Sequence, residues 1–114
     1  MGELIYHICR KDEWFSAKTV GIYNGSSQDK RDGFIHFSSF NQLEKSAAKH
    51  RAGQDGLVLL TVDTNLLGEL LKWEPSREGK LFPHLYGNLP LVAVVKEQDL
   101  ELGSDGFHIF SDLM

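Results

Sequence analysis

Short apolar segments alternate with polar ones along this chain, and their spacing predicts which segments are strands. Residues 4–9 (LIYHIC) and 33–38 (GFIHFS) are short and rich in β-branched and aromatic side chains, as strands usually are. Residues 57–63 (LVLLTVD) are almost continuously apolar, which is typical of a strand covered on both faces. We therefore expect this third strand at the centre of a sheet.

Two helices are expected in the N-terminal half. Residues 12–18 suit a short helix that stops at Gly21, because glycine is a common helix stop signal. A longer helix is expected to begin at Ser39 and to continue to about residue 51, because Ser-Phe-Asn-Gln forms a capping box in which Gln42 reaches back to the first residue. The side chains expected to be buried along it are Phe40, Leu43 and Ala47.

The remaining segments complete an α+β pattern. Residues 23–32 are rich in Asn, Gly, Ser, Asp and Gln, and a loop of this length is more often functional than connective. Three further strands are expected at residues 69–74, 81–85 and 91–96, with an edge strand in the tail from Asp99. Helices in the first half and strands in the second favour an α+β fold over a regular βαβ alternation.

Composition narrows the class of protein. The length of 114 residues predicts a single domain that spans residues 1–114. One cysteine cannot form an internal disulfide, and we expect neither a signal peptide nor a membrane span, so the sequence predicts a soluble cytoplasmic protein. The net charge of −4 disfavours nucleic acid as a partner. The basic clusters at residues 30–31 and 49–51 are interpreted as solvated surface.

Several kinds of chemistry find no support in the sequence. No pair of histidines has the spacing of a zinc site, and the pair His7 and Cys9 is better explained as a hydrogen-bonded histidine beside a small buried side chain. No Gly-x-Ser-x-Gly motif and no phosphate-binding glycine loop occurs. We therefore expect neither a metal site nor covalent catalysis.

Histidines in the strands are the first candidate for a ligand site. His7 and His36 each lie in the middle of a predicted strand, where a neutral imidazole can donate from one nitrogen and accept at the other. Each is either a satisfied core histidine or a group that orients a ligand, and the sequence leaves both interpretations open. His50 and His108 are interpreted as incidental.

A second candidate cluster lies in the C-terminal half. Residues 73–77 (WEPSR) place an aromatic ring beside a carboxylate at a strand end, and His84 and Tyr86 follow at a spacing of two. Aromatic rings with a few convergent polar groups are typical of a pocket for a small ligand, whereas core aromatics beside a solvated Glu74 would give the same pattern.

Taken together, these motifs resemble a known family. The blocks DGFIHFSS at residues 32–39, WEP at 73–75 and PHLYG at 83–87 resemble family 952 of the small bacterial domains of unknown function, over nearly the whole chain. That family has no established activity. It is similar in turn to the ADP-ribosyltransferase-like superfamily, which includes the RNA 2′-phosphotransferases. The resemblance implies a split β-sheet with a central cleft.

The superfamily resemblance also implies roles for particular residues. His7 would bind the ribose of NAD, and His36 and Ser38 would line the nicotinamide pocket, with NAD as a substrate and not a redox cofactor. The carboxylate that the transferases carry on a late strand has no clear counterpart: Glu74 is the candidate by chemistry, whereas His84, Tyr86 or Asn88 lies nearer in sequence. The candidate catalytic residues are Glu74 and His84, and the candidate ligand-binding residues are His7, His36, Ser38, Ser39, Trp73, Arg77 and Tyr86.

Two functions follow as hypotheses. The first is an ADP-ribosyltransferase-like enzyme, or a former enzyme, that binds NAD or a related ribonucleotide in a histidine-lined cleft. The second is a non-catalytic module that binds a small ligand or a protein partner on the same fold. An RNA end is a weaker third possibility, because the net charge of −4 opposes it.

Overall fold

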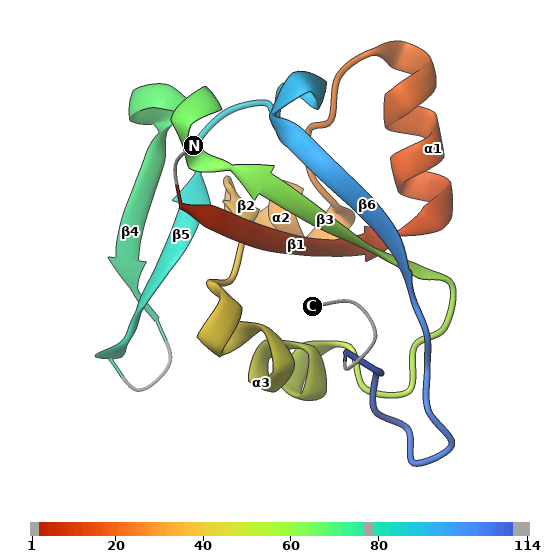
Figure 1. Cartoon of the computed structure of the whole chain (residues 1–114). Coiled ribbons are helices and arrows are strands. Elements are labelled where there is room, and N and C mark those ends of the chain that lie inside the picture. The colour runs from red at the N-terminus through yellow and green to blue at the C-terminus, as the bar shows by residue number, and fades with distance from the viewer. Residues whose placement is uncertain (1–2, 77–78, 111–114) are drawn as a thin grey trace.

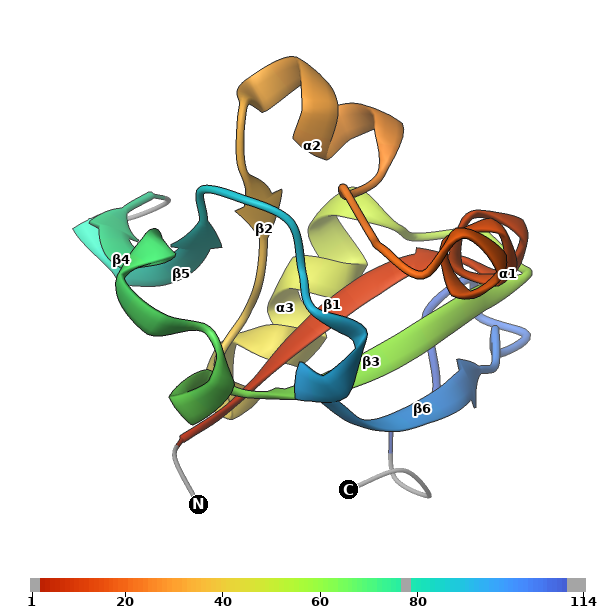
Figure 2. The same ribbon diagram turned by 90° about the horizontal axis from the view of Figure 1, so that it is seen from above.

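Two small antiparallel sheets form the framework of the computed structural model, which describes residues 3–76 and 79–110 (Figure 1). The first sheet has the order β1-β3-β6, and the second has the order β2-β5-β4. The strands are β1 (Leu4–Arg10), β2 (Ile35–His36), β3 (Leu57–Asp63), β4 (Leu71–Pro75), β5 (Leu81–Leu85) and β6 (Val94–Leu100). The two sheets lie side by side when the molecule is seen from above (Figure 2). The expected α+β architecture with more than one sheet is confirmed.

The central strand β3 explains how the first sheet is held. Its first six residues are buried, as expected from the apolar run, and it pairs antiparallel with β1 on one side and β6 on the other. The register sets His7 of β1 opposite Leu60, so a histidine lies in the middle of an apolar sheet. Burial of continuous apolar side chains on both faces is what drives this strand to the centre.

The described residues form three α-helices, one more than expected: α1 (Lys11–Val20), α2 (Ser27–Asp32) and α3 (Phe40–His50). Helix α1 ends at Gly21, whose φ of 97° is left-handed, as a glycine stop signal predicts. Helix α3 follows its N-cap Ser39, whose N–H donates to the carboxamide of Gln42 at 3.0 Å, so the predicted capping box is confirmed. The prediction for Phe40 is wrong, because this side chain is 57% exposed at the first turn of the helix.

Helix α2 lies inside the segment that was expected to be a loop. Its N-cap is Ser26, and Asp29 at the third helical position accepts a hydrogen bond from the backbone N–H of Ser26 at 2.7 Å. Aspartate in place of the usual Glu or Gln gives a capping box in a very short helix. The polar segment therefore contains a six-residue helix next to β2.

The strand expected at residues 33–38 is shorter than predicted, because it leaves one sheet for the other. Only Ile35 and His36 pair with β5. Two residues later Ser38 exchanges backbone hydrogen bonds of 2.8 Å with Tyr6 of β1. Residues 35–38 therefore join the two sheets, and the space between the sheets lies beside this segment.

The second half differs from the prediction at two strand boundaries. Residues 68–70 are a 3-10 turn, so β4 begins at Leu71 and not at residue 69. Residues 91–93 are also a 3-10 turn, so the last strand is β6, and Asp99 is part of it. Strand β5 is confirmed at residues 81–85. Beyond β6, the described residues form only one isolated bridge, between Leu102 and His108.

The helices cover the first sheet. Helix α1 packs against β1 and β3 on one face of the sheet, in the same core cluster as Ile35 and Leu85. Helix α3 packs against β1 on the other face, through Leu43 and Ala47 (Figures 1 and 2). Within the described ranges, none of the helices has the length and apolar character needed to span a bilayer. The elements that surround the gap between the sheets are thus β1, α2, α3 and the linking segment 35–38.

Candidate functional site

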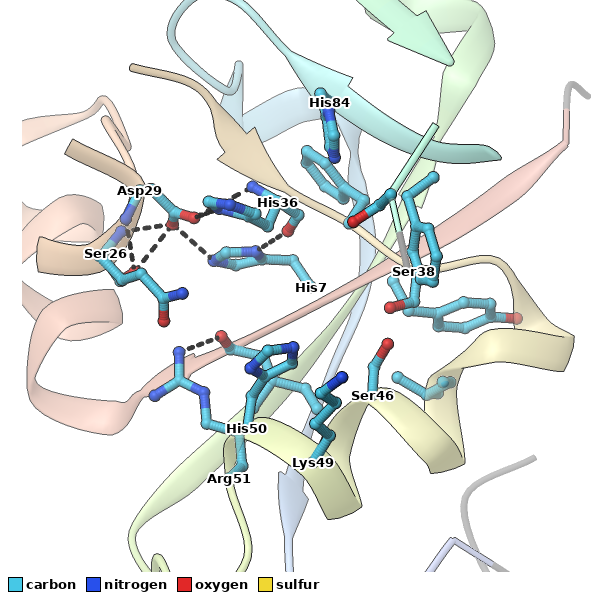
Figure 3. Close-up of a pocket in the computed structure, with 17 residues that line it drawn as sticks. His7, Ser26, Asp29, His36, Ser38, Ser46, Lys49, His50, Arg51 and His84 are labelled. Carbon is cyan, nitrogen blue, oxygen red and sulfur yellow. Dashed lines mark hydrogen bonds and ion pairs between the residues drawn. The ribbon is translucent and has the colours of Figure 1, made fainter. Parts of the chain in front are cut away.

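A pocket of about 290 Å³ lies between the two sheets and α3 (Figure 3). We call it the site pocket. Its walls come from β1, α2, the linking segment, α3 and β5. The residues that line it are Tyr6, His7, Ile8, Ser26, Gln28, Asp29, His36, Phe37, Ser38, Leu43, Ser46, Lys49, His50, Arg51, Ser76, Phe82 and His84. Four of the predicted site residues are therefore brought together here: His7, His36, Ser38 and His84.

Asp29 is the organising group of one wall, and it was not among the predicted site residues. Its Oδ2 accepts from the N–H and the Oγ of Ser26, at 2.7 and 2.9 Å. Its Oδ1 accepts from the backbone N–H of His36 at 3.0 Å and from Nδ1 of the same ring at 2.5 Å. Burial alone would raise the pKa of Asp29, but the hydrogen bond from the His36 ring and those from the backbone lower it, so the carboxylate is ionised.

His36 is held between two carboxylates. Its Nδ1 contacts Asp29, and its Nε2 lies 3.0 Å from Oδ2 of Asp32. A carboxylate only accepts hydrogen bonds, so both nitrogens of the ring face an acceptor oxygen. With both nitrogens engaged, His36 offers a ligand the face and edge of its ring, and no free nitrogen.

His7 is also saturated, by a different set of partners. Its Nδ1 donates to the backbone carbonyl of His36 at 2.6 Å. Nε2 is therefore the acceptor, and the Tyr23 hydroxyl donates a hydrogen bond to it at 2.7 Å. The ring is 3% exposed, and burial lowers its pKa despite the nearby Asp29, so His7 is neutral. A ribose hydroxyl could bind His7 only by displacing Tyr23. We interpret His7 as a positioning residue that fixes the carbonyl of His36.

The two predicted serines lie in different places. Ser38 is buried and lines the site pocket, and its backbone is tied to Tyr6. Ser39 is the N-cap of α3 and is not part of the pocket lining. Its position follows from the helix start and not from the site.

The second predicted cluster forms one hydrogen-bonded group on the second sheet. Oε1 of Glu74 accepts from the Tyr86 hydroxyl at 2.6 Å and from Nδ1 of His84 at 2.8 Å. These hydrogen bonds, with that of Tyr86 the stronger influence, lower the pKa of Glu74. His84 lines the site pocket, whereas Glu74 and Tyr86 stand behind it. Phe34 stacks on the His84 ring with centroids 4.1 Å apart, which further fixes the imidazole.

Trp73 does not reach the pocket in the structure described. Trp73 pairs with Pro83, and Glu74 pairs with Phe82, so the two neighbours point to opposite faces of β4. Trp73 is therefore on the face away from His84 and is not part of the pocket lining. Arg77 lies outside the described residues.

The opposite wall of the site pocket is basic, which the sequence interpretation missed. Lys49, His50 and Arg51, expected as solvated surface, all line the pocket at the C-terminal end of α3 (Figure 3). The Arg51 guanidinium donates to the carbonyl of Ile8 at 3.1 Å and to Oε1 of Gln54 at 3.2 Å. Both partners are neutral, so they fix the group without cancelling its charge.

His108 and His50 differ in their relation to the site pocket. His108 is buried away from the site pocket, with Nε2 bonded to the carbonyl of Gln54 at 2.7 Å. His50 was also interpreted as incidental, and the structure places it in the lining of the pocket. In residues 3–76 and 79–110 we find no cluster of three or more His, Cys, Asp or Glu side chains suited to a metal ion.

The fold and the site define a small α+β protein with two three-stranded antiparallel sheets and a histidine-lined pocket between them. The chain belongs to the family described as "Protein of unknown function (DUF952)", whose model matches residues 8–97. The predicted resemblance to family 952 is thereby confirmed. The similarity to the ADP-ribosyltransferase-like superfamily stays a prediction.

Solved structures of one relative agree with this fold. The crystal structure of protein CC0527 from Caulobacter crescentus is 49% identical, covers 96% of each chain and superposes with a TM-score of 0.92. The solution NMR structure of CC0527 gives 48% identity, a TM-score of 0.86 and coverage of 97% of this chain and 96% of that one. A comparison with curated proteins finds no match.

Proposed function

We propose that the site pocket binds a phosphorylated ribose compound, namely NAD or a related ribonucleotide. The observation that carries the proposal is the pairing of two unlike walls. One wall holds a positive charge that is fixed in place but not neutralised, at Arg51. The other holds the ionised Asp29, whose oxygens are already engaged by Ser26 and His36, together with hydroxyl, amide and imidazole groups that suit a sugar or a base.

The basic wall supports an anionic group on the ligand. Arg51 is oriented by two neutral oxygens, and a guanidinium held in this way can make charge-assisted hydrogen bonds to a phosphate. Lys49 forms no hydrogen bond or ion pair with any described residue, so its ammonium group is available. The chain as a whole has a net charge of −4, so the positive charge at this wall is local and contrasts with the rest of the surface.

The opposite wall supports a polar ring system. Ser38 brings a hydroxyl group, Gln28 brings a carboxamide, and the rings of Phe37 and Phe82 give apolar contact surface. The volume of about 290 Å³ is at the small end of ligand pockets, which run from roughly 300 to 1,000 Å³. This size suits one nucleotide unit and not a whole dinucleotide.

Isothermal titration calorimetry tests the proposal. NAD, ADP-ribose, AMP and nicotinamide mononucleotide are titrated into the wild type, the Arg51→Met variant and a control, Arg31→Met, which removes an exposed arginine outside the pocket. We expect saturable binding that Arg51→Met weakens about tenfold or more and that the control leaves unchanged. The absence of binding by all four compounds at millimolar concentration would exclude the ligand class, and equal affinity of wild type and Arg51→Met would exclude the role of Arg51.

A catalytic function is a second candidate, and it rests on His84. Nδ1 of this ring is hydrogen-bonded to Glu74, so Nε2 is the nitrogen that can contact a ligand. None of the described residues forms a hydrogen bond with Nε2. In an ADP-ribosyltransferase-like reaction the N-glycosidic bond of NAD breaks and nicotinamide leaves with the bonding electrons. Water or an acceptor hydroxyl then bonds to the ribose carbon and gives its proton to Nε2 of His84. Glu74 is a positioning residue in this scheme, because it acts through His84.

Release of nicotinamide, followed by chromatography, distinguishes the two candidates. An enzyme releases nicotinamide from NAD at a rate that falls strongly in His84→Ala, and Glu74→Gln shifts its pH profile because the ring loses its ionised partner. NAD that binds and stays intact assigns the protein to the non-catalytic alternative. The melting temperature of each variant is measured alongside, so that a loss of folding is not mistaken for a loss of activity.

A further inference from the structure

A second cavity lies next to the site pocket and is lined by residues of α3 and of the start of β5. It has a volume of about 440 Å³, and we call it the lysine cavity. The residues that matter in its lining are Asn41, Lys45, Lys49, Lys80 and Phe82. Lys49 and Phe82 line both this cavity and the site pocket, so the two spaces share a boundary.

The lysine cavity has a one-sided charge. Three lysines line it and no Asp or Glu does. Lys45 and Lys49 are four residues apart on α3, where like charges repel and destabilise a helix by a few tenths of a kcal/mol. Neither ammonium group forms an ion pair or a hydrogen bond with any residue that the structure describes. A bound anion would relieve the repulsion that the fold leaves in place.

We infer that the lysine cavity is the second half of the same ligand site and takes the second phosphate-bearing unit of a pyrophosphate-linked dinucleotide. The inference rests on the proposed function, because the first unit occupies the site pocket. The site pocket alone has room for about one nucleotide, so a dinucleotide must extend beyond it. The only shared cation, within the lining of the two spaces, is Lys49.

The boundary between the two spaces has the chemistry that a pyrophosphate needs. Lys49 lies at it with Arg51 on one side and Lys45 on the other. Asn41 adds a carboxamide that makes no hydrogen bond within the described residues and suits a ribose or a base. Phe82 is 8% exposed and gives both spaces a rigid aromatic border.

Calorimetry with whole and divided ligands tests the inference. NAD is compared with its two halves, AMP and nicotinamide mononucleotide, on the wild type and on the double variant Lys45→Ala/Lys80→Ala. The control is Lys96→Ala, an exposed lysine on β6 that lines neither space. All the lysines are exposed, so the variants should keep the fold, which circular dichroism verifies.

We expect NAD to bind the wild type more tightly than either half. The double variant should lose about three- to tenfold of affinity for NAD, and less than about twofold for the half that occupies the site pocket. The affinity for NAD should also fall more steeply with added salt in the wild type than in the double variant, because the lysines are exposed. The control should leave every affinity unchanged.

Each other outcome overturns a specific claim. If NAD binds no more tightly than its tighter half, or if the double variant binds NAD as the wild type does, the lysine cavity is not a subsite, although the site pocket still binds a nucleotide. If neither half nor NAD binds, the proposed function fails and the inference with it. If a short oligoribonucleotide binds more tightly than NAD and depends on Lys45 and Lys80, the ligand is RNA and the dinucleotide is wrong.

Discussion

Replacement of Asp29 by asparagine tests the wall on which the site pocket is built. The residue is 3% exposed, and its two oxygens accept four hydrogen bonds, two from Ser26 and two from His36. Asparagine has the same shape, but one of its oxygens is replaced by an NH2 group. Whichever way the amide is turned, that group faces two donors, and the charge that pairs with the His36 ring is lost.

The magnitude follows from the groups left unpaired. A buried donor without its acceptor costs about 1–3 kcal/mol, and the substitution leaves two such donors facing the NH2 group. The Ser26 hydroxyl can rotate to accept from the amide, which recovers part of this. We therefore expect Asp29→Asn to lower the free energy of unfolding by about 3 kcal/mol, a large fraction of the roughly 5–15 kcal/mol typical of a domain.

Urea denaturation followed by circular dichroism at neutral pH measures this loss. The matched control is Asp12→Asn, in which the aspartate is 68% exposed and pairs with Arg10 on the surface, so the change should be below about 1 kcal/mol. A loss for Asp29→Asn that is no larger than that of the control, with an unchanged slope in urea, would refute the reasoning.

The pH dependence gives a second measurement of the same residue. The pKa of Asp29 is lowered in the fold from its ordinary value of 3.8, so the unfolded chain takes up the proton first as the solution is acidified. The stability that Asp29 contributes is therefore present above about pH 4 and is lost as the pH falls below it. The difference in stability between wild type and Asp29→Asn should narrow from about pH 5 toward pH 2.

Three further predictions concern the buried groups near the site. Tyr23→Phe removes the hydroxyl that donates to Nε2 of His7, so we expect a loss of about 1–2 kcal/mol in urea denaturation; an unchanged midpoint would contradict this hydrogen bond. Cys9 is buried and burial raises its pKa to about 12, so a thiol reagent should react only after unfolding, and rapid reaction of the native protein would disprove the burial. Gly25→Ala should destabilise the protein by about 2 kcal/mol more than Gly21→Ala, because both residues have a φ of 97° but only at Gly25 would the new Cβ meet the site's buried aspartate, at 2.7 Å.

The elements that the sequence predicted well are those whose signals are local. Strand β3 was predicted with its bounds, because an uninterrupted apolar run has few other uses in a small domain. The start of α3 was predicted, because Ser39 and Gln42 satisfy each other within one turn. Helix α2 was missed although Ser26 and Asp29 carry a similar signal, since six polar residues without an apolar stripe are also typical of a loop.

The site was predicted only in part, because its geometry depends on contacts between distant segments. His7, His36 and His84 were identified as candidates, but the sequence cannot reveal that the first two have both ring nitrogens engaged. Lys49 and Arg51 were interpreted as solvated, since a basic end of a helix looks the same whether it faces water or a pocket. Pocket walls of this kind follow from tertiary packing, which periodicity does not report.

The saturation of His7 and Asp29 has a consequence for how a ligand binds. The groups at the back of the site pocket have all their partners before any ligand arrives, so that wall is preorganised. Binding then needs no induced fit there, and the ordering cost is confined to the long side chains on α3, at about 0.5–1.5 kcal/mol for each one immobilised. Arg51 is also held before a ligand arrives, by Gln54 and the Ile8 carbonyl, so Lys49 is the cation of the basic wall whose ordering adds to the cost of binding.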